Sequence, residues 1–141
     1  MIYIIIALIF YSVLIMFGTI ASRMADTNLV AAIENIVSGI LPILVAIPIL
    51  NGKTIQNQKV GLLIAVGVGI LLAFFTMFLN KAYATNKVAI VAPIVFGGSI
   101  FITAILSYFF FKEKISLFQG IGLAFLAIGL IFVTFARFTG R

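Results

Sequence analysis

Five long apolar runs, separated by short polar segments, constrain this chain more than any other feature. A hydrocarbon core of about 30 Å is crossed by about 20 helical residues, and each run has that length. A segment in lipid must bond its own backbone polar groups, which a helix does, and the runs do not alternate with period two as barrel strands do. We therefore predict an all-α membrane protein with five transmembrane helices, at residues 2–22, 29–50, 60–79, 88–111 and 116–135.

The spans and their connections take up almost all of the 141 residues, so we expect a single five-helix transmembrane domain over residues 1–141. Pro42, Pro48 and Pro93 fall inside spans. Each proline removes a backbone donor, so we expect a bend in its helix, which neighbouring helices can accommodate in a membrane.

Composition narrows the classes of function. Apolar residues make up 65% of the chain and there is no cysteine or histidine, which removes thiolate and imidazole ligands and the usual proton shuttle. The sequence also shows no nucleophile with a base and no phosphate loop, so we expect no enzyme, no metal and no cofactor. Nine Lys and Arg against three acids would suggest nucleic acid in a soluble protein, but here they lie in loops and at helix ends and indicate anchoring to the lipid bilayer.

The basic residues are divided almost evenly between the two faces of the membrane. The face of the N-terminus carries four, Lys53, Lys59, Lys112 and Lys114, and the other carries five, Arg23, Lys81, Lys87, Arg137 and Arg141. Orientation normally follows an excess of Lys and Arg on the cytoplasmic side. Either the chain inserts both ways up, which would supply the two halves of an antiparallel homodimer, or another signal decides its orientation.

The last 60 residues carry a family resemblance. Its elements are Ala-Tyr-Ala-Thr-Asn-Lys-Val-Ala-Ile-Val-Ala-Pro-Ile at 82–94, Ser-Tyr-Phe-Phe-Phe-Lys-Glu-Lys-Ile-Ser at 107–116, and Gln-Gly-Ile-Gly at 119–122 followed by Gly129. A proline early in the penultimate helix, a Lys-flanked Glu closing it and a glycine-rich final helix resemble an EamA-like domain of the drug/metabolite transporter superfamily. The resemblance implies one repeat of a multi-pass transporter in a cell membrane, with the prokaryotic inner membrane as the expected location.

The same resemblance implies a pair of chains. Most relatives carry two such repeats fused in inverted topology, and the small multidrug resistance group, a smaller cousin, works as antiparallel dimers of four-span chains. We therefore expect a ten-helix homodimer. Gly122 and Gly129 match a spacing in the dimerising last helix of that group, so we place the dimer interface there. The group's first-span glutamate has no counterpart here, which argues against proton-coupled export of cationic drugs.

Glu34 is the only carboxylate inside a predicted span. A charge toward the centre of a membrane helix costs about 2.5 kcal/mol or more, so an intramembrane acid normally faces a cavity or a partner. One hypothesis is that Glu34 binds a substrate amine or a proton. The other is a structural ion pair with Lys81, since the third span ends on the face where the second begins, which places Asn80 and Lys81 at a similar depth.

Other polar side chains repeat at helical spacing. Glu34 and Ser38 share a face of the second span with Asn35 beside them, and the fourth span carries Ser99, Thr103 and Ser107 at intervals of four. These stripes either line a polar cavity or make local bonds to the preceding turn. With two polar groups of the first span, the predicted substrate-binding set is Tyr11, Ser12, Glu34, Asn35, Ser38, Ser99 and Thr103.

The leading function is a secondary transporter of small organic solutes, with a midplane site between two chains that gives alternating access. A second hypothesis is a non-transporting helical subunit or assembly partner for another membrane protein. A third is a flippase for a lipid-linked carrier, for which an amphipathic lateral groove would be the structural signature.

Overall fold

The computed structural model describes residues 2–49, 56 and 58–138, with backbone alone at 137 and 138. The predicted span end at Leu50 and the basic residues Lys53 and Arg141 lie outside the described residues, as does the side chain of Arg137. The chain divides into two compact units, Met1–Thr85 and Asn86–Arg141, which are described separately below.

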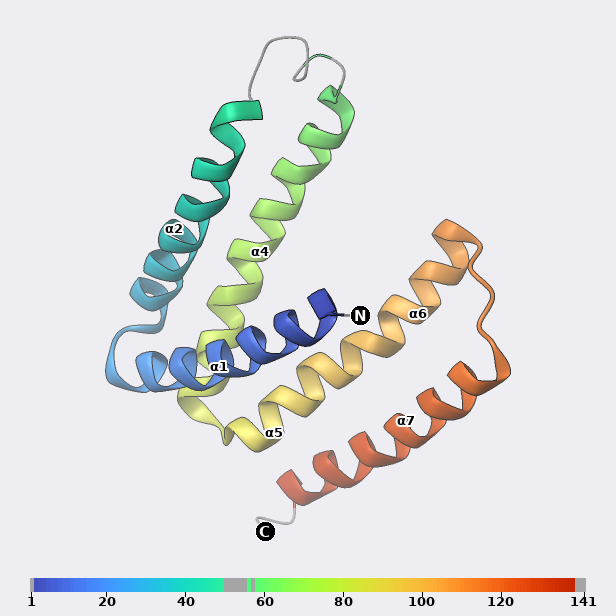
Figure 1. Ribbon diagram of the computed structural model, residues 1–141. Coiled ribbons are helices and arrows are strands. Elements are labelled where there is room, and N and C mark those ends of the chain that lie inside the picture. Colours follow the sequence, from blue (N-terminus) through green and yellow to red (C-terminus); the bar gives the residue numbers. More distant parts are fainter. Residues whose placement is uncertain (1, 50–55, 57, 139–141) are drawn as a thin grey trace. The chain divides into compact units, whose positions relative to one another are not determined.

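The first unit contains α1 (Ile2–Met24), α2 (Thr27–Ala46), the short 3-10 segment η1 (Ile47–Ile49) and α4 (Lys59–Thr85). Among these, α4 packs against both α1 and α2, and α2 and α4 lie side by side (Figure 1). Only Ala25 and Asp26 separate α1 from α2.

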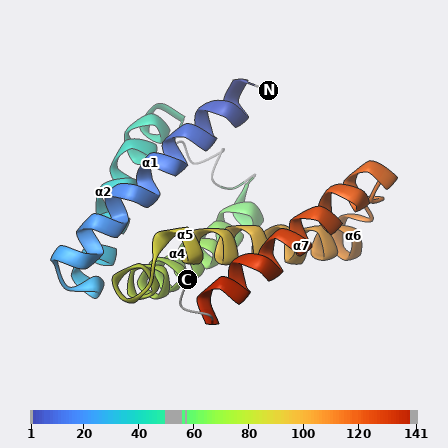
Figure 2. The same cartoon turned by 90° about the horizontal axis from the view of Figure 1, so that it is seen from below.

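The second unit contains α5 (Val88–Ala92), the π-helical segment η2 (Pro93–Gly97), α6 (Gly98–Phe111) and α7 (Leu117–Phe138). The segments α5, η2 and α6 follow one another without a break, and α7 returns antiparallel to them (Figure 2). Counted over both units, the described residues contain five helices long and apolar enough to cross a membrane: Ile2–Met24, Thr27–Ile49, Lys59–Thr85, Val88–Phe111 and Leu117–Ala136. The prediction of an all-α chain with five membrane-spanning helices is confirmed.

The N-terminus of α2 is capped by Asp26. Its side chain accepts hydrogen bonds from the backbone N–H groups of Asn28 at 2.9 Å and Leu29 at 3.1 Å. These are two of the first N–H groups of the helix, which have no partner within it. The helix therefore begins at Thr27, two residues before the apolar run that located it in the sequence.

The third span is longer than predicted. Hydropathy placed its end at Leu79 and treated residues 80–87 as a loop, but α4 continues to Thr85 and only Asn86 and Lys87 connect it to α5. A hydropathy run ends where side chains become polar, whereas a helix ends where its backbone bonding stops. Asn80 is polar and yet only 3% exposed, because its amide is bonded inside the first unit.

Two of the three prolines mark departures from α-helical geometry. The α-helix continues through Pro42, changes to 3-10 geometry around Pro48, and changes to π geometry at Pro93. Proline lacks the N–H group that would bond one turn back, and single π turns accommodate such interruptions. The side chain of Leu130 on α7 lies against the end of the π segment, where a Cβ added to Gly97 would stand 2.8 Å from Leu130 Cδ2.

The turn between α6 and α7 has a defined local structure. Lys112 closes α6 in the left-handed region, with φ 57° and ψ 26°. At the start of α7, Ser116 N–H donates to Gln119 Oε1 at 2.8 Å and Gln119 N–H donates to Ser116 Oγ at 3.3 Å. This reciprocal arrangement is a capping box, and its Ser-x-x-Gln signature before an apolar run is present in the sequence.

Candidate functional site

The first unit contains an open-sided cavity of about 510 Å³ between α1, α2 and α4. That volume falls within the range of small-molecule sites, about 300–1,000 Å³. Its α1 wall consists of Tyr11, Leu14, Ile15 and Gly18, which share one helical face. The other walls come from α2, with Ile33, Glu34, Asn35, Val37 and Ser38, and from α4, with Leu72, Phe75, Thr76, Leu79, Asn80 and Tyr83.

Glu34 lies between α1 and α4. Its Oε2 accepts a hydrogen bond of 2.8 Å from Asn80 Nδ2. Its Oε1 faces α1, where a Cβ built on Gly18 would stand 3.2 Å away, so the absence of a side chain at Gly18 leaves room for the carboxylate. The residues that line the cavity include no lysine or arginine.

The predicted ion pair between Glu34 and Lys81 is absent among the described residues. Lys81 is exposed, and the Glu34 carboxylate is instead bonded to Asn80, the residue before Lys81 in the chain. The reason is the continuation of α4: helical residues one apart point about 100° away from each other, so only one of the two can face α2.

Asn35 forms a second tie between α2 and α4. Its Nδ2 donates to Thr76 Oγ1 and to the carbonyl of Ala31, both at 2.7 Å. Thr76 Oγ1 in turn donates to the carbonyl of Ala73 at 3.0 Å. The amide nitrogen of Asn35 is thus occupied within the protein, so this residue joins the helices at the edge of the cavity.

Tyr83 is the most enclosed aromatic residue of the cavity, with 2% of its surface exposed. Within the described part of the chain its hydroxyl oxygen is buried and has no hydrogen-bond partner. Its backbone carbonyl accepts a bond of 3.3 Å from Arg23 Nε, which ties the end of α1 to α4. Tyr11 lines the same cavity from α1, so two tyrosines from different helices contribute to its wall.

The structure places the predicted binding residues in different surroundings. Tyr11, Glu34, Asn35 and Ser38 line the cavity of the first unit. Ser12 is exposed and donates to the carbonyl of Leu8 at 2.8 Å, the local bond that was the alternative interpretation. Two further predicted residues, Ser99 and Thr103, belong to the second unit and are exposed there.

Sequence reasoning missed Thr76 and Asn80 as lining residues. Together with Tyr83 they follow i, i+4, i+7 spacing and so share one face of α4. This spacing was readable from the sequence, but it crosses the point at which the predicted span ended. Because the predicted span ended at residue 79, Asn80 and Tyr83 were assigned to a loop and were not recognised as part of this face.

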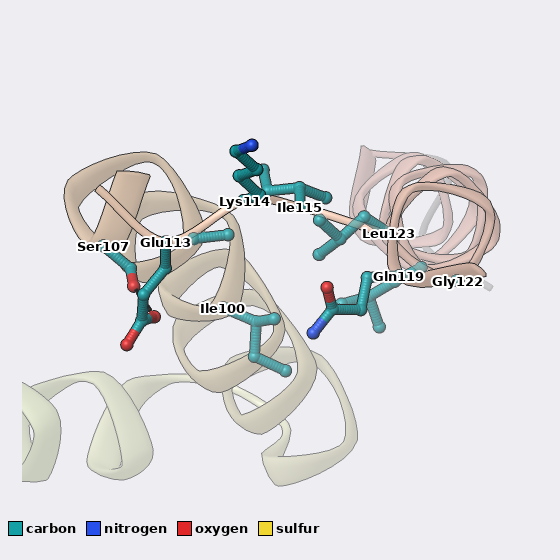
Figure 3. A pocket seen from close by; sticks show the side chains of 10 residues that line it. Ile100, Ser107, Glu113, Lys114, Ile115, Gln119, Gly122 and Leu123 are labelled. Atoms are coloured by element: carbon teal, nitrogen blue, oxygen red, sulfur yellow. Dashed lines mark hydrogen bonds between the residues drawn. The ribbon is translucent and has the colours of Figure 1, made fainter. Parts of the chain in front are cut away.

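The second unit holds another cavity, of about 460 Å³, between α6 and α7. Figure 3 shows Ser107 and Glu113 turned toward each other on one side and Gln119 with Leu123 on the other. Ser107 Oγ and Glu113 Oε2 are hydrogen-bonded. The polar lining residues therefore lie in or near the turn between α6 and α7, and the rest of the lining is mostly apolar, with residues such as Ile100, Leu123 and Leu126.

The two glycines proposed for the dimer interface lie on α7 with open space beside them. A Cβ added to Gly122 or Gly129 would meet no atom within 4 Å. Gly122 also lines the cavity of the second unit. Both positions are exposed.

Comparison with known proteins identifies a matching family but no individual relative. The EamA-like transporter family matches residues 1–135, which is nearly the whole chain. No curated protein matches the chain, and no solved structure does.

Proposed function

The chain belongs to the EamA-like transporter family, and from that premise we propose that it is a secondary transporter of small organic solutes whose binding site is the cavity between α1, α2 and α4. The observation that carries this proposal is Glu34, a carboxylate within a membrane-spanning helix that faces a cavity of solute size. Ionisable groups inside the membrane are costly and are retained mainly at substrate and ion pathways.

The proposed unit of transport is a homodimer of ten helices with alternating access at a midplane site. Alternating access in such folds is the rocking of one repeat against its inverted counterpart, and a single repeat needs a second chain for that motion. Two observations support the pairing: the small-residue face of Gly122 and Gly129 is open, and the Lys and Arg counts of the two membrane faces are nearly equal.

Transport is tested on the full chain reconstituted in proteoliposomes, by recording solute-dependent currents on a supported membrane across a panel of amines, amino acids and organic acids. We expect a saturable signal for at least one solute, and we expect Glu34→Gln to remove it. Size-exclusion profile and circular dichroism of the variant establish that it still folds. A folded wild-type protein with no signal across the panel would favour the second hypothesis, a non-transporting subunit.

Dimer orientation is tested by forcing the topology. Three added lysines at the N-terminus should hold that terminus in the cytoplasm, and three added at the C-terminus should do the opposite. If an antiparallel pair is the active unit, each variant alone is inactive and the two expressed together recover transport. Full activity of either variant alone would exclude the antiparallel pair.

A second candidate function is movement of a lipid-linked carrier. The observation that favours it is the cavity between α6 and α7, with Lys114 and Gln119 near its polar end and an apolar interior. A phosphate head group would pair with Lys114 while a prenyl chain lies along the apolar wall. Liposomes containing a fluorescent polyprenyl phosphate, with dithionite quenching of the outer leaflet, test this: protein-dependent scrambling that Lys114→Gln abolishes would support it.

A further inference from the structure

The cavity of the first unit contains a carboxylate oxygen without a partner. Oε2 of Glu34 is bonded to Asn80, but Oε1 accepts no hydrogen bond within the described part of the chain, and no described basic side chain forms an ion pair with this residue. Gly18 leaves open the side of α1 that Oε1 faces. Glu34 is part-buried and lies in a membrane-spanning helix, where a charge with no compensating group is unfavourable, so a cation from outside the chain would complete the site.

A second polar atom in the same cavity is also unsatisfied. The hydroxyl of Tyr83 is buried and without a hydrogen-bond partner in the part of the chain that the structure describes, although buried phenols normally find one. Tyr83 follows Asn80 by three residues, so the two side chains are neighbours on one face of α4. Glu34, Asn80 and Tyr83 all line this cavity, and we refer to these three residues as its polar corner.

The rest of the cavity is apolar and aromatic. Leu14 and Ile15 of α1, Ile33 and Val37 of α2, and Phe75 and Leu79 of α4 form most of its wall. A ligand that fills about 510 Å³ must therefore present a hydrocarbon body to these residues and a donor group to the polar corner.

We propose, resting on the function proposed above, that the solute is a protonated primary or secondary amine with an apolar body, and that its N–H groups donate to Glu34 Oε1 and to the Tyr83 hydroxyl. Recognition at this site requires both a positive charge and an N–H donor. A quaternary ammonium ion satisfies the charge but cannot donate, so it leaves both acceptors unbonded. A neutral alcohol donates once but leaves the carboxylate uncompensated.

Three probes of matched shape separate these requirements: phenethylamine, its N,N,N-trimethyl derivative and 2-phenylethanol. Binding to the full chain in lipid nanodiscs is measured by isothermal titration calorimetry at pH 7. We expect phenethylamine to bind at least about tenfold more tightly than either of the other two, since a hydrogen bond to a charged group and an unpaired charge within a membrane-spanning helix each correspond to a tenfold effect or more. This comparison uses the wild-type protein, so it holds even where a variant fails to fold.

Variants then assign the two acceptors. Glu34→Gln should abolish phenethylamine binding. Tyr83→Phe should weaken the binding of phenethylamine and leave the binding of the trimethyl derivative unchanged. The ratio of the two affinities should therefore become smaller. Tyr108→Phe is the matched control, because Tyr108 lies on α6 with 52% of its surface exposed, and it should change neither affinity.

Several results would overturn the proposal. One is equal or tighter binding of the trimethyl derivative, which would indicate an aromatic cage that recognises charge alone. Others are equal binding of 2-phenylethanol, phenethylamine binding that survives Glu34→Gln, or no binding of phenethylamine at all. Failure of the transport proposal is distinguishable: phenethylamine would bind with the expected selectivity in nanodiscs and yet produce no current in proteoliposomes.

Discussion

Asn80 donates a hydrogen bond of 2.8 Å from its side-chain amide to Oε2 of Glu34, and this bond joins the second and third spans at the polar corner of the cavity. Asn80 is almost fully buried, and it is the residue at which the apolar run of the third span stops. The bond therefore lies at the place where hydropathy indicated a loop and the structure has a continuous helix.

The first prediction concerns the strength of this bond. A double-mutant cycle with Glu34→Ala and Asn80→Ala should give a coupling energy of about 0.6 kcal/mol, with about 1.7 kcal/mol as the upper end for hydrogen bonds between membrane helices. Unfolding in mixed micelles by added SDS measures it. Additive single-variant effects, with no coupling, would contradict the contact.

The second prediction concerns Gly18. Replacing it with alanine places a methyl group 3.2 Å from Glu34 Oε1, which must move or lose access to the ligand. We expect Gly18→Ala to weaken phenethylamine binding by about tenfold, equivalent to about 1.4 kcal/mol. Gly39→Ala on α2 is the control, because a Cβ there meets nothing within 4 Å, and its affinity should match wild type. Equal affinities of the two variants would exclude the proposed position of the ligand.

The third prediction concerns the contact of α7 with the π-helical segment. A methyl group at Gly97 would stand 2.8 Å from Leu130 Cδ2, whereas one at Gly98 meets nothing within 4 Å. Both substitutions gain helix propensity, but only the first adds overpacking, which costs about 1–3 kcal/mol. Gly97→Ala should therefore be less stable than Gly98→Ala by at least about 1 kcal/mol in SDS unfolding, and the added change Leu130→Val should recover part of the loss.

The fourth prediction concerns the capping box of α7. Ser116→Ala removes the side-chain acceptor of the Gln119 N–H and should destabilise the protein by about 1 kcal/mol. Ser99→Ala is a suitable comparison, since that hydroxyl only donates to the carbonyl of Phe96 in its own turn and the change should stay within about 0.5 kcal/mol. Similar losses of stability in Ser116→Ala and Ser99→Ala would contradict a stabilising role of the capping box.

The sequence by itself determined that this is a five-helix membrane chain, because the length of an apolar run that crosses lipid follows from the rise of the helix and the thickness of the bilayer. It also singled out Glu34, because a carboxylate inside such a run is rare enough to stand out. Ser38 and Asn35 were grouped with Glu34 because they lie on or beside one face of the second span, and Tyr11 was added as a polar group of the first span.

Only the tertiary structure decided which side chains meet across helices. It replaced Lys81 by Asn80 as the partner of Glu34, brought Thr76 and Tyr83 to the same cavity, and left Ser12 bonded to its own helix. The physical reason is that hydropathy reports the affinity of a segment for lipid, whereas a site depends on which helical faces are turned toward each other. The rotation of α4 about its axis follows from packing against α1 and α2, and no run of apolar residues encodes it locally.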